Sequence, residues 1–232
     1  MAAIYARERG LDPDEVLNLV MVMAFAGILG ARALYLAESD LGALADPGEW
    51  IGTRGFSFYG GMIGGILGAF ALLRRRGLDS RYLDVLAVGF PLGMAVGRLG
   101  DVINGEHYGP ASDLPWAFRY AHPDAEVPSS IVAYHSGGFY EVVLALGIFA
   151  VVWPLRGRLT VPGLALAAVV GLYAAGRFAM FFVRDDSDTI LLGLSSSHLI
   201  SLALLAVSIG GALAALSRER RPERSGSTNL MS

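Results

Sequence analysis

The sequence contains no cysteine and no lysine. The absence of cysteine excludes disulfide bonds, thiolate metal sites and a cysteine nucleophile supplied by the protein itself. All 18 basic residues are arginines, whose guanidinium groups suit contacts with anions where the dielectric constant is low. The formal net charge is only −3, so the composition indicates no nucleic-acid partner. The apolar stretch within the first ten residues is short and is followed directly by charged residues, so no cleavable signal peptide is expected there.

Apolar sequence is abundant instead. Hydrophobic residues make up 54% of the 232 residues, and the mean hydropathy of +0.51 is typical of a polytopic membrane protein. A membrane-spanning helix needs about 20 apolar residues and about 17 can suffice. Six segments meet this length, and they predict an all-α, polytopic transmembrane helix bundle. The segments are roughly 16–36, 56–73, 82–103, 139–155, 162–183 and 194–216.

The arginines predict how the spans are oriented. Loops rich in arginine alternate with loops that are acidic or poor in arginine, and the C-terminal segment RERRPER is basic. Because arginine is retained on the cytoplasmic side, both termini are predicted to be cytoplasmic. We expect one membrane domain over residues 1–217, with residues 105–137 forming a loop region at the outer face. Residues 218–232 are predicted to be a disordered cytoplasmic tail.

Glycines recur every four residues in two of the spans. One run is Gly60, Gly64 and Gly68, and the other is Gly89, Gly93 and Gly97. This spacing predicts close packing between helices. A phosphate-binding glycine loop is the alternative, but no strand precedes either run.

Three arginines lie inside the apolar spans at similar depth. Arg32, Arg98 and Arg177 each follow the inner end of a span by a distance of roughly 22–24 Å along the helix axis. Snorkelling to the outer interface is one interpretation of each residue taken singly. Three arginines at one depth instead favour a shared polar site, because a charge inside the bilayer usually faces the bundle interior and has a partner.

The segment GRLGDVINGEHYG, residues 97–109, ends the third span with several polar residues. Arg98 and Asp101 are three residues apart, and Tyr173 and Arg177 are four apart. Residues at these spacings lie on the same face of a helix and can interact. Gly105 is expected to unwind the helix and to expose backbone N–H groups beside Arg98. Together these features predict an anion site near the outer interface, and a lipid phosphate is the anion found at that depth.

This segment resembles the signature G-R-x-G-N-F-x-N-x-E-x-x-G of the bacterial prolipoprotein diacylglyceryl transferases. The matching residues are Gly97, Arg98, Gly100, Asn104, Glu106 and Gly109. Further stretches are similar to other parts of the same family in the same order: GARALYL, FSFYGGMIGG, LPWAF, YHSGGFYE and GLYAAGRF.

The resemblance implies a transferase of the bacterial plasma membrane whose site faces the outer leaflet. Its reaction would move the diacylglyceryl group of phosphatidylglycerol to the lipobox cysteine of an exported prolipoprotein and release glycerol 1-phosphate. No metal or organic cofactor is implied. The residues expected to be catalytic are Arg98, Arg177, Tyr59, Asn104 and Glu106. Those expected to bind phosphatidylglycerol are Arg98, Arg177, Tyr173, Arg32, Tyr35, Gly109 and His198.

The chain departs from the family pattern at several positions. Tyr59 replaces a histidine proposed as a base, and a tyrosine has an ordinary pKa of about 10. Asp101 replaces an asparagine, Phe181 an acidic residue and His198 a glutamine. His198 could take over acid–base chemistry, or it could simply be hydrogen-bonded within the bundle. The family has seven spans, so the chain is expected to lack a counterpart of the family's first helix.

Two other functions stay open on the sequence alone. A degenerate paralog could bind anionic phospholipid without turnover. A small-molecule transporter is the third possibility, but the sequence shows no convincing internal repeat.

Overall fold

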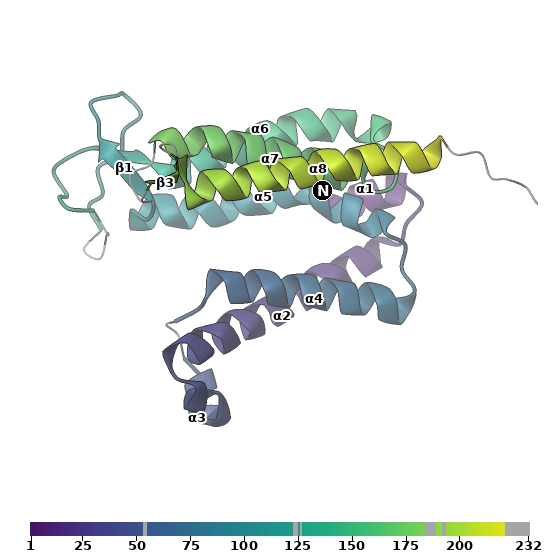
Figure 1. Cartoon of the computed structure of the whole chain (residues 1–232), viewed down its shortest axis with the longest axis horizontal. Helices are drawn as coiled ribbons and strands as arrows, with labels where there is room; N and C mark the ends of the chain where they lie inside the picture. The colour runs from purple at the N-terminus through teal and green to yellow at the C-terminus, as the bar shows by residue number, and fades with distance from the viewer. Residues whose placement is uncertain (53–54, 123–124, 126, 184–188, 192–193, 221–232) are drawn as a thin grey trace, which may run out of the picture. The chain divides into compact units, whose positions relative to one another are not determined.

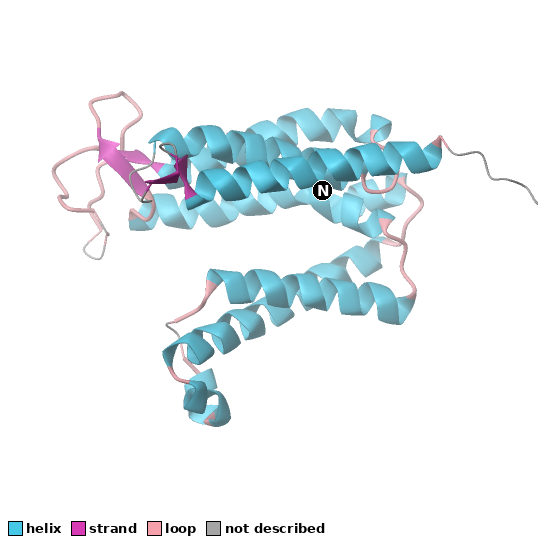
Figure 2. Cartoon of the chain, in the orientation of Figure 1, coloured by secondary structure: helices cyan, strands magenta, loops and turns pink. Residues whose placement is uncertain are grey.

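The structure is a computed structural model that describes residues 1–52, 55–122, 125, 127–183, 189–191 and 194–220. Nearly all of the regular structure is helical (Figure 2). The chain divides into two compact units, Met1–Leu86 and Ala87–Ser232. An all-α architecture is confirmed, while the single membrane domain over residues 1–217 stays a prediction.

The first unit contains two long helices and several short elements (Figure 1). Helix α2 begins behind Asp12, whose carboxylate accepts a hydrogen bond from Asp14 N at 2.9 Å, and Pro13 occupies the first helical position. Helix α4 ends at Gly77, which adopts φ +62°, the left-handed conformation that glycine tolerates. The elements are α1 (Ala2–Glu8), α2 (Pro13–Ser39), η1 (Leu41–Ala45), α3 (Pro47–Trp50), α4 (Phe58–Arg76) and the start of α5 (Arg81–Asn104).

Glycines bring α2 and α4 into backbone contact. A Cβ atom built on Gly30 would lie 2.4 Å from the Gly60 carbonyl oxygen, and one on Gly64 would lie 2.2 Å from the Ala26 carbonyl oxygen. Only glycine fits at such distances, so the packing predicted from the first glycine run is confirmed. The second run behaves differently, because a Cβ on Gly93 or Gly97 would meet no atom within 4 Å.

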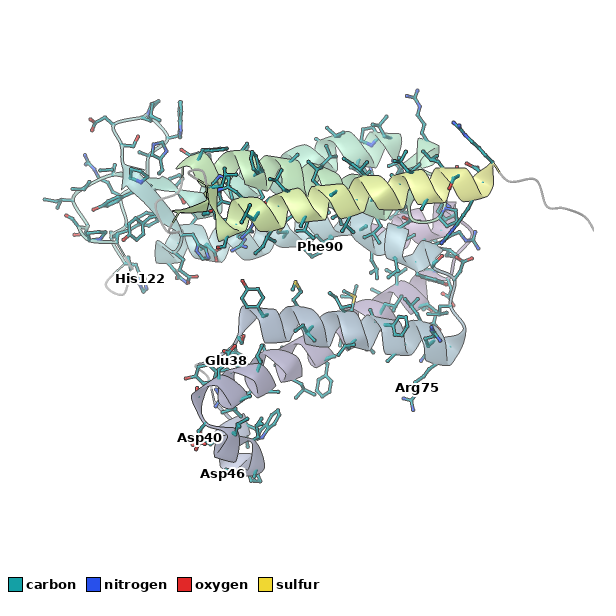
Figure 3. All side chains as sticks on the ribbon, viewed as in Figure 1. Glu38, Asp40, Asp46, Arg75, Phe90 and His122 are labelled. Carbon is teal, nitrogen blue, oxygen red and sulfur yellow. The ribbon has the colours of Figure 1, made fainter. Side chains whose placement is uncertain are left out.

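Charge separates along the two packed helices of the first unit. Glu38, Asp40 and Asp46 lie together at one end, near η1 and α3, whereas Arg75 lies at the opposite end of α4 (Figure 3). The acidic and basic loops seen in the sequence therefore lie at opposite ends of the α2–α4 pair.

The second unit is built on α5 and three further long helices, with the strands gathered at one end (Figure 2). Helix α7 packs against both α6 and α8. Gly176 permits the first of these contacts, because a Cβ there would lie 2.2 Å from Leu144 Cδ1. The elements after α5 are β1 (Tyr108–Ala111), β2 (Tyr134–Ser136), α6 (Gly137–Leu155), η2 (Arg156–Arg158), α7 (Leu164–Met180), η3 (Phe181–Val183), β3 (Thr189–Leu191), β4 (Leu194–Ser195) and α8 (Ser196–Glu219).

Each of the six predicted spans is a helix. Among the described residues, four helices are long and apolar enough to cross a membrane by length and composition. They are Pro13–Ser39, Arg81–Asn104, Gly137–Arg158 and Ser196–Glu219. Helix α7 is a shorter apolar helix, and α4, rich in glycine and ending in three arginines, is not among the four. Helix α8 continues to Glu219, past the predicted start of the tail, and residues 221–232 lie outside the described residues.

Large apolar side chains cover the outside of the long helices. Met21 is 70% exposed, Phe25 67% and Val207 71%. In water such surfaces would favour aggregation, whereas in a bilayer the surrounding lipid is as apolar as the side chains. The chain is therefore a polytopic membrane protein.

Candidate functional site

The site in the second unit begins where α5 unwinds. Helix α5 ends at Asn104, and Gly105 adopts φ +73°, which reverses the chain. The Glu106 N–H donates to the Asp101 carbonyl oxygen at 3.1 Å. The predicted unwinding is confirmed, but this N–H is engaged by the helix end and is not presented to a ligand beside Arg98.

A small sheet holds the loop that follows. Strand β1 pairs antiparallel with β2, and Phe118 exchanges two backbone hydrogen bonds of 2.9 Å with Tyr134. The sequence predicted only a loop region here. The Gly137 N–H donates to the His107 carbonyl oxygen at 2.9 Å, which ties the start of α6 to the end of α5.

The Tyr120 ring packs against the turn at Gly105. Its side chain is 3% exposed, and a Cβ atom on Gly105 would lie 3.0 Å from the Tyr120 ring. Burial raises the pKa of the Tyr120 phenol above its ordinary value, because the charged phenolate would lose its hydration. The residue therefore acts as a neutral packing group.

The start of α6 presses closely on the last turns of α5. Ser136 caps α6 by accepting a hydrogen bond from Phe139 N at 3.2 Å. A Cβ on Gly138 would lie 2.9 Å from Asp101 Cβ, so glycine is needed for this approach. One turn later, α6 places Glu141 beside Arg98. The glycines of the SGG segment thus permit the contact between the two helices.

Glu141 joins arginines from two other helices. The Arg98 Nε forms an ion pair with Glu141 Oε2, and Arg98 Nη1 forms another with Asp101 Oδ2. Arg177 Nη1, from α7, lies 3.3 Å from Glu141 Oε1. We name Arg98, Asp101, Glu141, Tyr173 and Arg177 the Glu141 cluster. The predicted pairing of Arg98 with Asp101 is confirmed, and so is the convergence of Arg98 and Arg177.

Arg177 is held from its own helix as well. Its Nη1 donates to the Tyr173 hydroxyl at 2.7 Å, one turn earlier on α7. Its guanidinium carbon lies 4.9 Å from the centre of the Phe181 ring, a cation–π distance. An aromatic ring therefore stands where the family pattern has an acidic residue, and Arg177 keeps Glu141 as its carboxylate partner among the described residues.

The Glu141 cluster balances two guanidinium groups against two carboxylates. The Glu141 side chain is 1% exposed, whereas those of Arg98 and Arg177 are 20% and 27% exposed. The hydrogen bonds and ion pairs described above use Nε and Nη1 of Arg98 and Nη1 of Arg177. Within the described residues no such bond engages Nη2 of either arginine. Both arginines therefore keep donors with which they could grip a phosphate.

Other predicted residues lie at the end of α5, in β1 and at the start of α8. Asn104 Nδ2 donates to Glu106 Oε1 at 3.0 Å, and Gly109 is buried in β1. His198 is 3% exposed, and its Nδ1 accepts from Ser195 N at 3.1 Å at the start of α8. The interpretation of His198 as a histidine hydrogen-bonded in the bundle is confirmed for this nitrogen.

The remaining predicted residues lie in the first unit. Arg32 is buried, and it donates to the Glu49 carbonyl oxygen from Nε at 2.9 Å and to the Gly55 carbonyl oxygen from Nη1 at 2.9 Å. Its guanidinium carbon lies 5.5 Å from the centre of the Tyr35 ring. Tyr59 begins α4 and is 58% exposed. In the structure Arg32 therefore fixes its own loop. Lipid binding by Arg32 and Tyr35 and a catalytic role for Tyr59 stay predictions.

Sequence reasoning missed the carboxylate at the centre of the cluster. Glu141 ends the YHSGGFYE stretch, and its depth near the outer end of a span matched that of the arginines. Depth alone does not give a partner, because the face of a helix rich in alanine and leucine is poorly defined by periodicity.

Comparison with known proteins identifies the family of the chain. The family description "Prolipoprotein diacylglyceryl transferase" matches residues 1–214. The chain belongs to the prolipoprotein diacylglyceryl transferase family. It is therefore a member of a family of membrane transferases, and the resemblance drawn from the sequence motifs is confirmed.

Curated members of the family resemble most of the chain. The phosphatidylglycerol–prolipoprotein diacylglyceryl transferase of Corynebacterium diphtheriae is 30% identical over 238 residues, covering 95% of this chain and 84% of the relative. That of Clostridioides difficile is 30% identical over 213 residues, covering 90% and 80%. That of Methylobacillus flagellatus is 32% identical over 209 residues, covering 87% and 76%.

Proposed function

We propose that this diacylglyceryl transferase transfers the diacylglyceryl group of phosphatidylglycerol to the thiol of the lipobox cysteine of an exported prolipoprotein, and releases glycerol 1-phosphate. The names of its relatives supply the two substrate classes. The observation that carries the proposal is the convergence of Arg98 and Arg177 on Glu141. Two cations from separate helices thereby share one carboxylate.

The reaction has a clear electrostatic demand. The thiol gives up its proton, which the departing glycerol phosphate can take up. The thiolate sulfur attacks the glycerol carbon that carries the phosphate ester, a carbon–sulfur bond forms, and the carbon–oxygen bond breaks. The electron pair of that bond leaves with the glycerol phosphate, so negative charge grows on the departing oxygen. Groups that interact more strongly with the charge growing on the leaving group than with the bound substrate accelerate such a step. The free Nη2 donors of Arg98 and Arg177 suit this role, because a guanidinium holds phosphate oxygens through two parallel hydrogen bonds.

Glu141 and Tyr173 position the two arginines. Glu141 prevents the guanidinium groups from repelling one another before substrate binds, and it fixes their separation. Tyr173 holds Arg177 Nη1 at 2.7 Å, so less side-chain freedom is lost when a phosphate binds. Asn104 and Glu106 are proposed to orient the glycerol head group at the mouth of the cluster. Tyr35, Arg32, Gly109 and His198 complete the proposed lipid-binding set, and Tyr59 is proposed to be catalytic.

We place the reaction at the outer side of a bacterial plasma membrane, with both termini in the cytoplasm. The acidic end of the α2–α4 pair and its basic opposite end support this orientation (Figure 3). The Glu141 cluster lies near the end of α5, where the strands gather, and the orientation puts that end on the exported side. After export, a precursor presents its lipobox cysteine on this side of the membrane.

The test is a reconstituted reaction. Purified protein is mixed in detergent with phosphatidylglycerol and a synthetic lipobox peptide, and the thioether product is sought by mass spectrometry. Product is expected with the cysteine peptide and not with its serine analogue. A protein that retains phosphatidylglycerol but forms no thioether would instead support binding without turnover. In that case Tyr59→His is the informative variant, because it restores an imidazole where the family has one.

A further inference from the structure

A second group of polar side chains shares Asp101 with the Glu141 cluster. Asp101, Glu106 and His107 each offer a ligand atom, and these atoms all lie within 4.8 Å of one another. The group combines two carboxylates with an imidazole. We name these three residues the α5-end triad.

The backbone holds the triad in place. Gly105 adopts φ +73° and His107 φ +56°, so the chain turns back over the end of α5 within two residues. The Glu106 N–H donates to the Asp101 carbonyl oxygen at 3.1 Å, and the His107 carbonyl oxygen accepts from Gly137 N at 2.9 Å. The three side chains therefore start from a fixed frame, and little ordering entropy remains to be lost when they take up a shared ligand.

We propose that the α5-end triad binds a divalent transition-metal ion of the zinc type. Imidazole nitrogen with carboxylate oxygen is a donor set of Zn²⁺ sites, whereas Mg²⁺ and Ca²⁺ prefer oxygen ligands alone. Ligands about 2.0–2.2 Å from a tetrahedral ion lie about 3.3–3.6 Å from one another. Because the three ligand atoms already lie within 4.8 Å of one another, side-chain movements of about 1 Å bring them to this spacing. Water completes the coordination.

The carboxylates can accept the ion without leaving their present partners. Asp101 uses Oδ2 for Arg98, and Glu106 uses Oε1 for Asn104 Nδ2 at 3.0 Å. Each carboxylate keeps a second oxygen for coordination. His107 supplies the nitrogen ligand that distinguishes the triad from an ordinary acidic surface.

The ion is an inhibitor rather than a cofactor, and this consequence rests on the proposed function. A bound dication occupies the Glu106 carboxylate and withdraws charge from Asp101, the partner of Arg98. The head group of phosphatidylglycerol would then meet an altered site, and transfer would slow.

Calorimetric titration of the purified, tag-free protein with ZnCl₂ in detergent tests the binding without reference to activity. The test variant is His107→Asn, because asparagine tolerates the left-handed backbone of this position. The matched control is His122→Asn, which changes a histidine outside the triad in the same loop region. We expect one Zn²⁺ per wild-type chain, the same for His122→Asn, and at least about tenfold weaker binding for His107→Asn, since loss of even an outer partner of a metal ligand costs about 10- to 100-fold. MgCl₂ should give no binding heat.

Two further measurements make the outcome decisive. Co²⁺ in place of Zn²⁺ should give visible absorption bands in wild type that His107→Asn lacks, while circular dichroism shows both proteins folded. Equal Zn²⁺ affinity in wild type and His107→Asn, or no stoichiometric binding, would overturn the proposal. In the reconstituted assay, Zn²⁺ should slow wild type and spare His107→Asn, which keeps its basal rate. An enzyme without measurable transfer leaves the binding experiment fully interpretable.

Discussion

Arg177 Nη1 lies 3.3 Å from Glu141 Oε1, although the two residues are on different helices. The other oxygen of the same carboxylate is paired with Arg98. A single buried carboxylate thus fixes the distance between two cations that the sequence places in separate spans. The geometry of the proposed phosphate site depends on Glu141 more than on either arginine alone.

Replacing Glu141 should therefore weaken both fold and function. Glu141→Ala leaves two partly buried guanidinium groups facing one another, and removing one partner of a buried ion pair costs about 3–5 kcal/mol. We expect a lower free energy of unfolding, measured by denaturation in detergent, and loss of transfer activity. The matched control is Glu38→Ala, which removes an exposed carboxylate and should change stability by less than about 0.5 kcal/mol. Equal effects of the two substitutions would contradict the central role of Glu141.

A lysine at position 98 should not replace the arginine. Arg98 uses Nε and Nη1 for two different carboxylates, and a lysine ammonium is a single point charge that cannot reproduce this fork. Arg98→Lys removes at least one charge-assisted hydrogen bond worth about 1.5–3 kcal/mol, so the rate of transfer should fall by at least about tenfold. Arg75→Lys, at the far end of α4, serves as the control and should keep its rate. Retention of full activity by Arg98→Lys would mean that charge alone suffices at this position.

Helix positions could be predicted from the sequence because lipid imposes a length on every apolar segment. All six segments are helices, and the unwinding at Gly105 followed from a glycine between polar residues. The pairings of Arg98 with Asp101 and of Arg177 with Tyr173 followed from spacing along one helix. Contacts between helices were less accessible. Glu141 lies in the sequence at a depth like that of the arginines, but its partners depend on how α6 is rotated, which an apolar sequence does not reveal.

Other features could not be predicted from the sequence for a different reason. The strands β1 and β2 are short and depend on pairing across the loop, so no local pattern marks them. The two glycine runs look alike in sequence, yet Gly60 and Gly64 lie against the backbone of α2, while a Cβ on Gly93 or Gly97 would meet no atom within 4 Å. A spacing of four residues between glycines predicts that another helix can approach closely, but it does not identify that helix.

The glycine contact between α2 and α4 should be intolerant of a side chain. A Cβ on Gly30 would lie 2.4 Å from the Gly60 carbonyl oxygen, so Gly30→Ala must push α2 and α4 apart. Overpacking of this kind costs about 1–3 kcal/mol, and the melting temperature in detergent should fall. Gly93→Ala is the matched control, because its Cβ meets no atom within 4 Å, and alanine is the better helix former. If Gly93→Ala destabilised the protein as much as Gly30→Ala, the assignment of the first run as the α2–α4 contact would lose its support.

His198 should act as a helix cap rather than as a base. Its Nδ1 accepts from Ser195 N at 3.1 Å, a capping-box arrangement in which the third helical residue is usually glutamate or glutamine. His198→Gln offers an amide oxygen to the same N–H, so both melting temperature and transfer rate should remain close to wild type. His198→Ala leaves the N–H without this acceptor and should cost about 0.5–2 kcal/mol of stability. Thermal unfolding and initial rates measured on the same preparations separate the two roles. A folded His198→Gln protein that had lost its activity would show that the imidazole itself takes part in the chemistry.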